Sequence, residues 1–222
     1  MSADPQLDHW QAQWQRALQL WSDHLQLQEP LWLFDVQAAT QAGLTDSFAA
    51  IRLTSQRVMV NLQDITQRGL DDYALEVLAH EIGHHVYAPA NMTQHLQLLA
   101  VIRQALPGSE QLAPLVANLY TDLLINQHLQ RNTPCQMDAI YQRLKPATAT
   151  PLWQLYMRIY ERLWQLPPET LTSAPLGSSE EGDAWLGSRI IKVYGKDWLT
   201  GASRWGYPVD KLCRLWISHK AP

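Results

Sequence analysis

The chain of 222 residues has a net charge of −4, and 46% of its residues are hydrophobic while only 17% are charged. This composition excludes a disordered tail and is typical of a compact protein with a full hydrophobic core. The Lys and Arg residues are scattered singly and no apolar run approaches the ~20 residues of a spanning helix, so we expect no nucleic acid and no membrane among its partners.

Residues 1–5 lack the charged-then-apolar order of a secretory signal, so we expect the protein in the cytoplasm. Its only cysteines are Cys135 and Cys213. In the reducing cytoplasm these two residues are expected to remain free thiols rather than to form a disulfide.

Periodic Trp and Leu residues predict an N-terminal helix from about Pro5 to Leu27. The stripe includes Trp10, Trp14 and Trp21. A nucleic-acid stacking platform would need neighbouring cations, and no cation other than Arg16 lies near the stripe. We therefore expect these aromatic side chains to pack in the core.

Three short strand-like runs follow, at residues 31–36, 48–54 and 58–62. The last two are separated by a turn-like segment, and apolar residues nearly alternate in the third. The runs predict a small antiparallel sheet, and strand 58–62 could bind an extended peptide along its edge.

The next predicted helix follows Gly69 and begins near Asp71, where Asp71 and Asp72 provide an N-terminal cap. It contains His-Glu-Ile-Gly-His at residues 80–84. Residues four apart lie one above the other in a helix, so the imidazoles of His80 and His84 can bind one metal ion. Glu81 is turned about 100° away and is predicted to act as a base beside the metal.

The same helix has two distinct sides on a helical wheel. The expected core side comprises Leu75, Leu78, Ala79, Ile82 and Val86. The expected site side comprises Tyr73, His80, His84 and Tyr87. A chance His-Glu-x-x-His in this chain has odds of roughly one in a hundred, so the pattern indicates a zinc helix.

The remaining chain is predicted to be helical almost throughout. The expected helices cover residues 93–106, 111–131, 137–144, 151–165, 181–194 and 208–218. We therefore expect a mostly helical α+β fold with a small sheet packed on the zinc-binding helix. The expected domains are a core at 1–166, a linker at 167–180 and a Trp-rich helical extension at 181–222 that packs on the core, with Ser178 and Glu181 as a capping box.

A catalytic zinc has three protein ligands and one open position, so a third donor is needed. Helix 111–131 places Asn118, Asp122 and Asn126 in one polar stripe, which should be at least half buried. Burying an ionised carboxylate among leucines is costly unless a cation or hydrogen bonds compensate its charge, and a metal ion is the most effective compensation. Asp122 is therefore the first candidate for the third ligand. Asn126 would hold a ligand in place. The alternative is an Asp122 capped by its two Asn neighbours without a metal.

His95 is the rival third ligand, on the apolar face of helix 93–106. A lone histidine on such a face is more often a core residue, and His95 follows His84 so closely that the chain would have to return tightly. His85 and His128 are expected to be structural or solvated.

The zinc helix, with a preceding strand and a later acidic helix, resembles the gluzincin-like zinc metallopeptidases. More narrowly, residues 80–84 and 118–126 are similar to metallopeptidase domains of bacterial proteins that carry or neighbour von Willebrand factor A modules and MoxR-type ATPases. This resemblance covers about residues 45–130. It implies a zincin-like fold, a zinc cofactor, and a von Willebrand factor A or MoxR-type ATPase partner. The thermolysin-like Asn-Glu-x-x-x-Asp helix and the third metzincin His are absent, so substrate preferences do not transfer.

The sequence thus predicts a zinc metallopeptidase that cleaves a peptide or protein substrate. His80, His84 and Asp122 would hold zinc, and Glu81 would assist the attack of zinc-bound water on the peptide bond. Tyr87 and Tyr120 are candidate donors to the developing oxyanion. The alternative function is a non-catalytic zincin scaffold that binds a partner protein.

Overall fold

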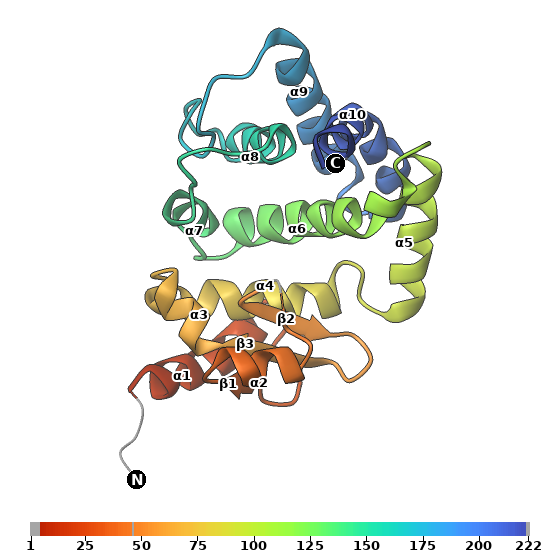
Figure 1. Ribbon diagram of the computed structural model, residues 1–222. Helices are drawn as coiled ribbons and strands as arrows, with labels where there is room; N and C mark the ends of the chain where they lie inside the picture. Colours follow the sequence, from red (N-terminus) through yellow and green to blue (C-terminus); the bar gives the residue numbers. More distant parts are fainter. Residues whose placement is uncertain (1–4, 46, 221–222) are drawn as a thin grey trace. The chain divides into compact units, whose positions relative to one another are not determined.

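The computed structural model describes residues 5–45 and 47–220, except for the side chains of Tyr207 and residues 211–220. The chain divides into two compact units. The first unit comprises Met1–Met92 and Asn132–Leu144, and the second comprises Thr93–Arg131 and Lys145–Pro222. The protein is mostly helical with a small sheet, which confirms the predicted α+β class (Figure 1).

The first unit contains the sheet and the His-Glu-x-x-His helix. Its elements are α1 (Pro5–Gln19), β1 (Leu31–Leu33), α2 (Val36–Gln41), β2 (Ala49–Arg52), β3 (Arg57–Asn61), α3 (Leu62–Gln67), the 3-10 turn η1 (Asp71–Tyr73), α4 (Ala74–Val86) and α7 (Met137–Arg143). Helix α4 packs on β2 and β3 and against α1 (Figure 1).

The sheet is mixed, so the predicted antiparallel sheet is wrong in one of its pairings. Strand β2 is antiparallel to β3, but β1 is parallel to it, with Leu31 opposite Met59. The reason lies in the connection, because the chain passes through α2 and β2 before β3 enters between the two earlier strands. Since β3 is central, the expected peptide-binding edge at strand 58–62 is also wrong, and the outer strands are β1 and β2.

The aromatic stripe of α1 packs in the core, as predicted. Trp10 and Trp14 are both buried, at 0% and 3% exposure. The helix ends at Gln19, earlier than the expected Leu27. Beyond this end the indole Nε1 of Trp21 donates a hydrogen bond to the Ala79 carbonyl of α4 at 2.8 Å. A tertiary contact to α4 thus takes the place of a further helical turn.

Helix α4 starts without the predicted aspartate cap. The N-cap residue is Tyr73, which makes no side-chain cap hydrogen bond. The Oδ1 atom of Asp71 instead accepts hydrogen bonds from Gln6 Nε2 at 2.8 Å and from Thr66 Oγ1 at 2.7 Å. Asp71 therefore ties α1 and α3 together, which its position before a helix could not reveal.

Helix α7 belongs to the first unit although α5 and α6 precede it in the chain. The Glu76 carboxylate on α4 accepts a hydrogen bond from the Gln136 backbone N–H at 3.1 Å. The nearby Cys135 is buried with a free thiol, and burial raises its pKa to about 11. The thiol is therefore protonated at neutral pH. The side chain of Cys213, the second cysteine predicted to be a free thiol, lies outside the described side chains.

The second unit is helical. Its elements are α5 (Met92–Gln104), the 3-10 turn η2 (Glu110–Leu112), α6 (Ala113–Asn132), α8 (Pro151–Trp164), α9 (Ser178–Tyr194) and α10 (Trp198–Lys220). Helix α9 begins at Ser178 with Gly177 as an N-cap that has no side-chain cap bond, so the predicted capping box is absent. Helix α10 begins ten residues before the predicted start and continues through Pro208.

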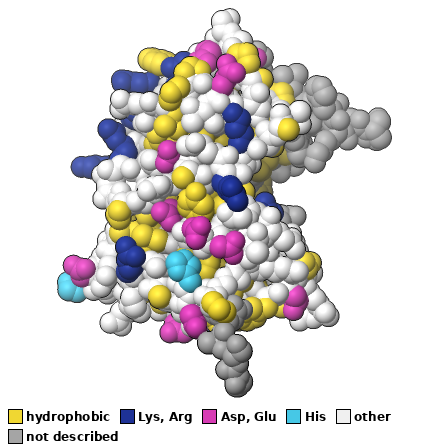
Figure 2. Space-filling model, turned by 90° about the vertical axis from the view of Figure 1, so that its left-hand side faces the viewer, with side chains coloured by type: hydrophobic (Ala, Val, Ile, Leu, Met, Phe, Trp, Pro, Cys, Tyr) yellow, Lys and Arg dark blue, Asp and Glu magenta, His cyan; other side chains and the backbone are white. Residues whose placement is uncertain are grey.

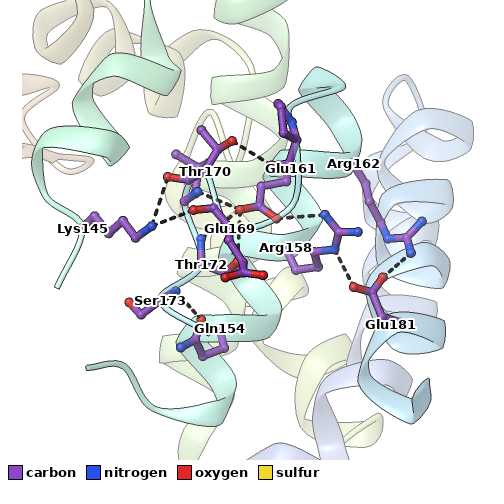
Figure 3. A network of polar contacts seen from close by, with 12 residues as sticks. Lys145, Gln154, Arg158, Glu161, Arg162, Glu169, Thr170, Thr172, Ser173 and Glu181 are labelled. Atoms are coloured by element: carbon purple, nitrogen blue, oxygen red, sulfur yellow. Dashed lines mark hydrogen bonds and ion pairs between the residues drawn. The ribbon is translucent and has the colours of Figure 1, made fainter. Parts of the chain in front are cut away.

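The segment that leads from α8 to α9 is tied to α8 by Glu161 (Figure 3). The fully buried Glu161 carboxylate accepts hydrogen bonds from the backbone N–H groups of Leu171 at 2.7 Å and Thr172 at 2.9 Å. It also accepts one from Arg158 Nη1 at 2.9 Å. Part of the segment predicted as a linker is thus held in place.

Charged side chains of both signs are interspersed on the face drawn in Figure 2, where Lys and Arg form no continuous stripe. Among the described residues, no helix combines the length and the apolar character that a membrane crossing requires.

Candidate metal centre

The two histidines of α4 face each other on successive turns. Their Nε2 atoms lie 3.2 Å apart, and their ring centroids are separated by 4.9 Å with the ring planes at 88°. Helix geometry produces this pairing, because residues four apart project from the same side of the helix. The predicted convergence of His80 and His84 is therefore present within one element.

The ring of His84 is oriented by the backbone. Its Nδ1 atom lies 3.1 Å from the carbonyl oxygen of Ala88, a buried residue two positions beyond the end of α4. A carbonyl can only accept, so Nδ1 carries the hydrogen and donates it. In a neutral ring Nε2 then presents its lone pair toward His80. Metal-binding histidines characteristically donate their other ring N–H to a carbonyl or carboxylate in this way.

Glu81 is buried next to His80, with 7% of its surface exposed. Helix α4 is buried around most of its circumference, since Val77 and Gly83 are buried as well. The predicted division into one core side and one open site side is therefore only partly right.

Asp122 lies in the middle of α6, and the polar stripe around it runs from exposed to buried. Asn118 is exposed, Asp122 is half-buried and Asn126 is 1% exposed. Asn118 Nδ2 donates a hydrogen bond to Asp122 Oδ2 at 3.0 Å. The predicted alternative was an Asp122 capped by two asparagines, and the structure shows the hydrogen bond from the first of them, Asn118.

Asn126 belongs to a buried hydrogen-bond chain that sequence reasoning did not anticipate. Its Nδ2 atom donates to Tyr160 Oη at 2.8 Å, and Tyr160 Oη lies 2.8 Å from Tyr156 Oη. The two tyrosines are four residues apart on α8, and this spacing was the only signal available. These hydrogen bonds fix the orientation of the Asn126 side-chain amide. If Asn126 positions a metal ligand, it does so with an amide that is already held in place.

Tyr120 and Tyr87 have different surroundings. The Tyr120 hydroxyl donates to the Trp198 carbonyl at 2.7 Å, and its ring packs on Trp205. Tyr87 follows the end of α4, contacts the Trp21 ring, and has a pKa raised by burial. Its hydroxyl therefore stays protonated at neutral pH and is able to donate a hydrogen bond.

The candidate ligands His80 and His84 lie on α4 in the first unit, and Asp122 lies on α6 in the second unit. Two imidazole nitrogens and one carboxylate oxygen are donors that zinc and other first-row divalent metals accept. His95, the rival ligand, lies half-buried on α5, also in the second unit. His85 and His128 are half-buried, and burial lowers the pKa of both.

Comparison with protein-family models, curated proteins and solved structures finds no match for this chain. Its function is therefore inferred from its own residues.

Proposed function

We propose that the protein is a zinc-dependent metallopeptidase with a zincin-like arrangement of the zinc helix and sheet. The observation that carries the proposal is the convergence of the His80 and His84 Nε2 atoms at 3.2 Å, with His84 Nδ1 bound to the Ala88 carbonyl. Two imidazole nitrogens this close could bind the same metal ion when both are unprotonated. Asp122 is proposed as the third ligand.

A zinc ion held by these three residues would lower the pKa of a water molecule to about 7 and polarise the carbonyl of a peptide bond. Glu81, one position after His80 on the buried side of α4, would accept the proton from the attacking water and return it to the leaving amine. Tyr87 and Tyr120 are the candidate oxyanion donors, and the Tyr120 hydroxyl donates to the Trp198 carbonyl in this structure.

The decisive experiment compares Glu81→Gln with Glu76→Gln. Both change one buried glutamate of α4 to its amide, and the Glu76 amide oxygen can still accept from the Gln136 N–H. We expect the Glu81 variant to retain stoichiometric zinc and to lose hydrolysis of fluorescein-labelled denatured casein by at least about 100-fold. The Glu76 variant should retain both properties. Unchanged hydrolysis in the Glu81 variant would remove this residue from the mechanism.

The third ligand is tested separately by zinc content in Asp122→Ala and His95→Ala. We expect zinc to be lost from the first variant and retained by the second. The opposite result would make His95 the ligand and overturn the assignment of Asp122.

The second candidate function is a non-catalytic module that keeps this scaffold and binds a partner protein. Exposed apolar side chains on α9, including Trp185 and Val193, favour a binding role in addition to or instead of catalysis. Wild-type protein that binds zinc in equal amount but hydrolyses no peptide bond would favour this candidate. A von Willebrand factor A or MoxR-type ATPase partner and a cytoplasmic location remain expectations from the sequence.

A further inference from the structure

Helices α9 and α10 form an apolar groove on the second unit. Its volume is about 590 Å³. The lining residues, which define the α9–α10 groove, are Leu186, Arg189, Ile190, Val193, Tyr194 and Arg204. Five of these residues lie on one stripe of α9, at spacings of three and four, and Arg204 comes from α10. The groove contains no residue of the candidate metal centre.

The opposite stripe of α9 faces the interior and fixes the helix. A Cβ atom on Gly187 would lie 2.8 Å from Ile159 Cδ1 and 3.0 Å from Trp205 Cζ3, so α9 packs closely against α8 and α10 here. The walls of the groove are therefore held by the core. On the outer stripe Val193 is 60% exposed, and Trp185, which lies outside the groove on the same helix, is 55% exposed.

Two arginines give the groove a positive charge. Arg204 places its guanidinium 5.6 Å from the centre of the Tyr194 ring, and neither Arg204 nor Arg189 forms an ion pair with any described side chain. The Glu181 carboxylate of the same helix is bound by Arg158 and Arg162. The two guanidinium groups are thus available to an acidic partner, and Arg and Tyr, both present in the groove, are enriched at protein interfaces.

We propose that the α9–α10 groove is a docking site for an amphipathic segment of a partner protein that carries apolar side chains next to Asp or Glu. The stripe from Leu186 to Val193 spans about 10 Å along α9, which matches the anchors at positions i, i+3 or i+4, and i+7 of an amphipathic helix. Two cations at separate positions of an open groove favour a segment with several acidic groups over a single small anion. This docking site is independent of the proposed peptidase activity.

The test is a selection of random dodecapeptides displayed on phage against the full chain, with counter-selection against Val193→Glu. Val193 is mostly exposed, so this variant should fold normally, which circular dichroism verifies. We expect the retained peptides to combine apolar residues with Asp or Glu. Their affinity, measured with synthetic peptides by titration calorimetry, should fall about tenfold or more in Arg189→Glu and in Arg204→Glu.

Lys192→Glu is the matched control, because Lys192 is an exposed α9 residue that makes the same charge change outside the groove. We expect it to change the affinity by less than about threefold. Replacing the acidic residue of the peptide by Lys should restore binding to Arg189→Glu.

Four results would overturn the proposal. In the first, selection yields no peptide that distinguishes the wild type from Val193→Glu, and in the second it yields only peptides without acidic residues. In the third, the wild-type chain dimerises in sedimentation experiments and Val193→Glu makes it monomeric, which assigns the groove to an interface between two copies. Binding of decanoate, sensitive to both arginine reversals, together with failure of every peptide would likewise assign the groove to a small anionic amphiphile.

Discussion

The histidine pair on α4 and the Glu161 network on α8 are both polar groups inside a helical protein, but they differ in how charge is balanced. In the network, Arg158 and Arg162 face the carboxylates of Glu161 and Glu181, so cations and anions compensate each other (Figure 3). At the histidine pair, two ring nitrogens converge on each other. The network is held by ion pairs between side chains that are present in the chain, whereas the ring nitrogens of the histidine pair can share one hydrogen or bind the metal ion proposed above.

This comparison predicts the largest loss of stability at Glu161. Replacing it by Ala leaves the backbone N–H groups of residues 171 and 172 and the Nη1 atom of Arg158 without the Glu161 acceptor, although Arg158 Nε still donates to Glu181. We expect the free energy of unfolding to fall by about 3–5 kcal/mol in urea titrations. Glu169→Ala, at an exposed position of the same segment, is the control and should cost less than about 0.5 kcal/mol. Equal losses in the two variants would show that Glu161 does not anchor the segment.

Substitution of a histidine of the α4 pair should mainly lower the affinity for zinc. We expect His80→Ala to weaken zinc binding by at least about 100-fold, measured by competition with a chromophoric chelator. His85→Ala changes a histidine of the same helix that is not part of the metal-binding group and should retain the affinity. If both variants bind zinc equally well, the contrast between the two regions disappears.

Close packing of α9 on α8 supports the network and should be sensitive to one added methyl group. Gly187→Ala places a Cβ 2.8 Å from Ile159 Cδ1, and we expect it to cost about 1–3 kcal/mol of unfolding free energy. Gly182→Ala, in the same helix, has no atom within 4 Å of the new Cβ and should stabilise the protein by about 0.5–1 kcal/mol. A gain in stability from both substitutions would indicate looser packing of α9.

The smallest expected effect concerns pH. Burial would raise the pKa of Glu181, but hydrogen bonds from Arg158 and Arg162 prevail and hold it below its usual value of 4.5. Because the folded-state pKa is lowered, Glu181 contributes stability above pH 4.5 and loses it as the pH falls through the folded pKa. The contribution, at most about 1 kcal/mol, is the difference between wild type and Glu181→Gln in unfolding curves at pH 7 and pH 3. A difference that grows toward acid would contradict this sign.

The sequence predicted the histidine pair of the candidate site but not the groups that hold the site residues in position. The pairing of His80 with His84 follows from helical spacing alone. The Ala88 carbonyl that orients His84 is a backbone group, and no residue type marks it in the sequence. The Asn126–Tyr160–Tyr156 chain was also missed, because it joins helices that lie far apart in the sequence.

By itself the sequence determined the helical class, the approximate positions of the longer helices other than the start of α10, the buried stripe of α1 and the placement of two imidazoles on one side of α4, but it missed the short helices α2 and α3. These properties depend on periodicities of three to four residues, which are set by backbone geometry within one element. Only the tertiary structure decided the parallel pairing of β1 with β3, the early end of α1 and the anchoring of the α8–α9 segment by Glu161. Each of these depends on contacts between residues distant in the chain, whose free energy overrides local preference.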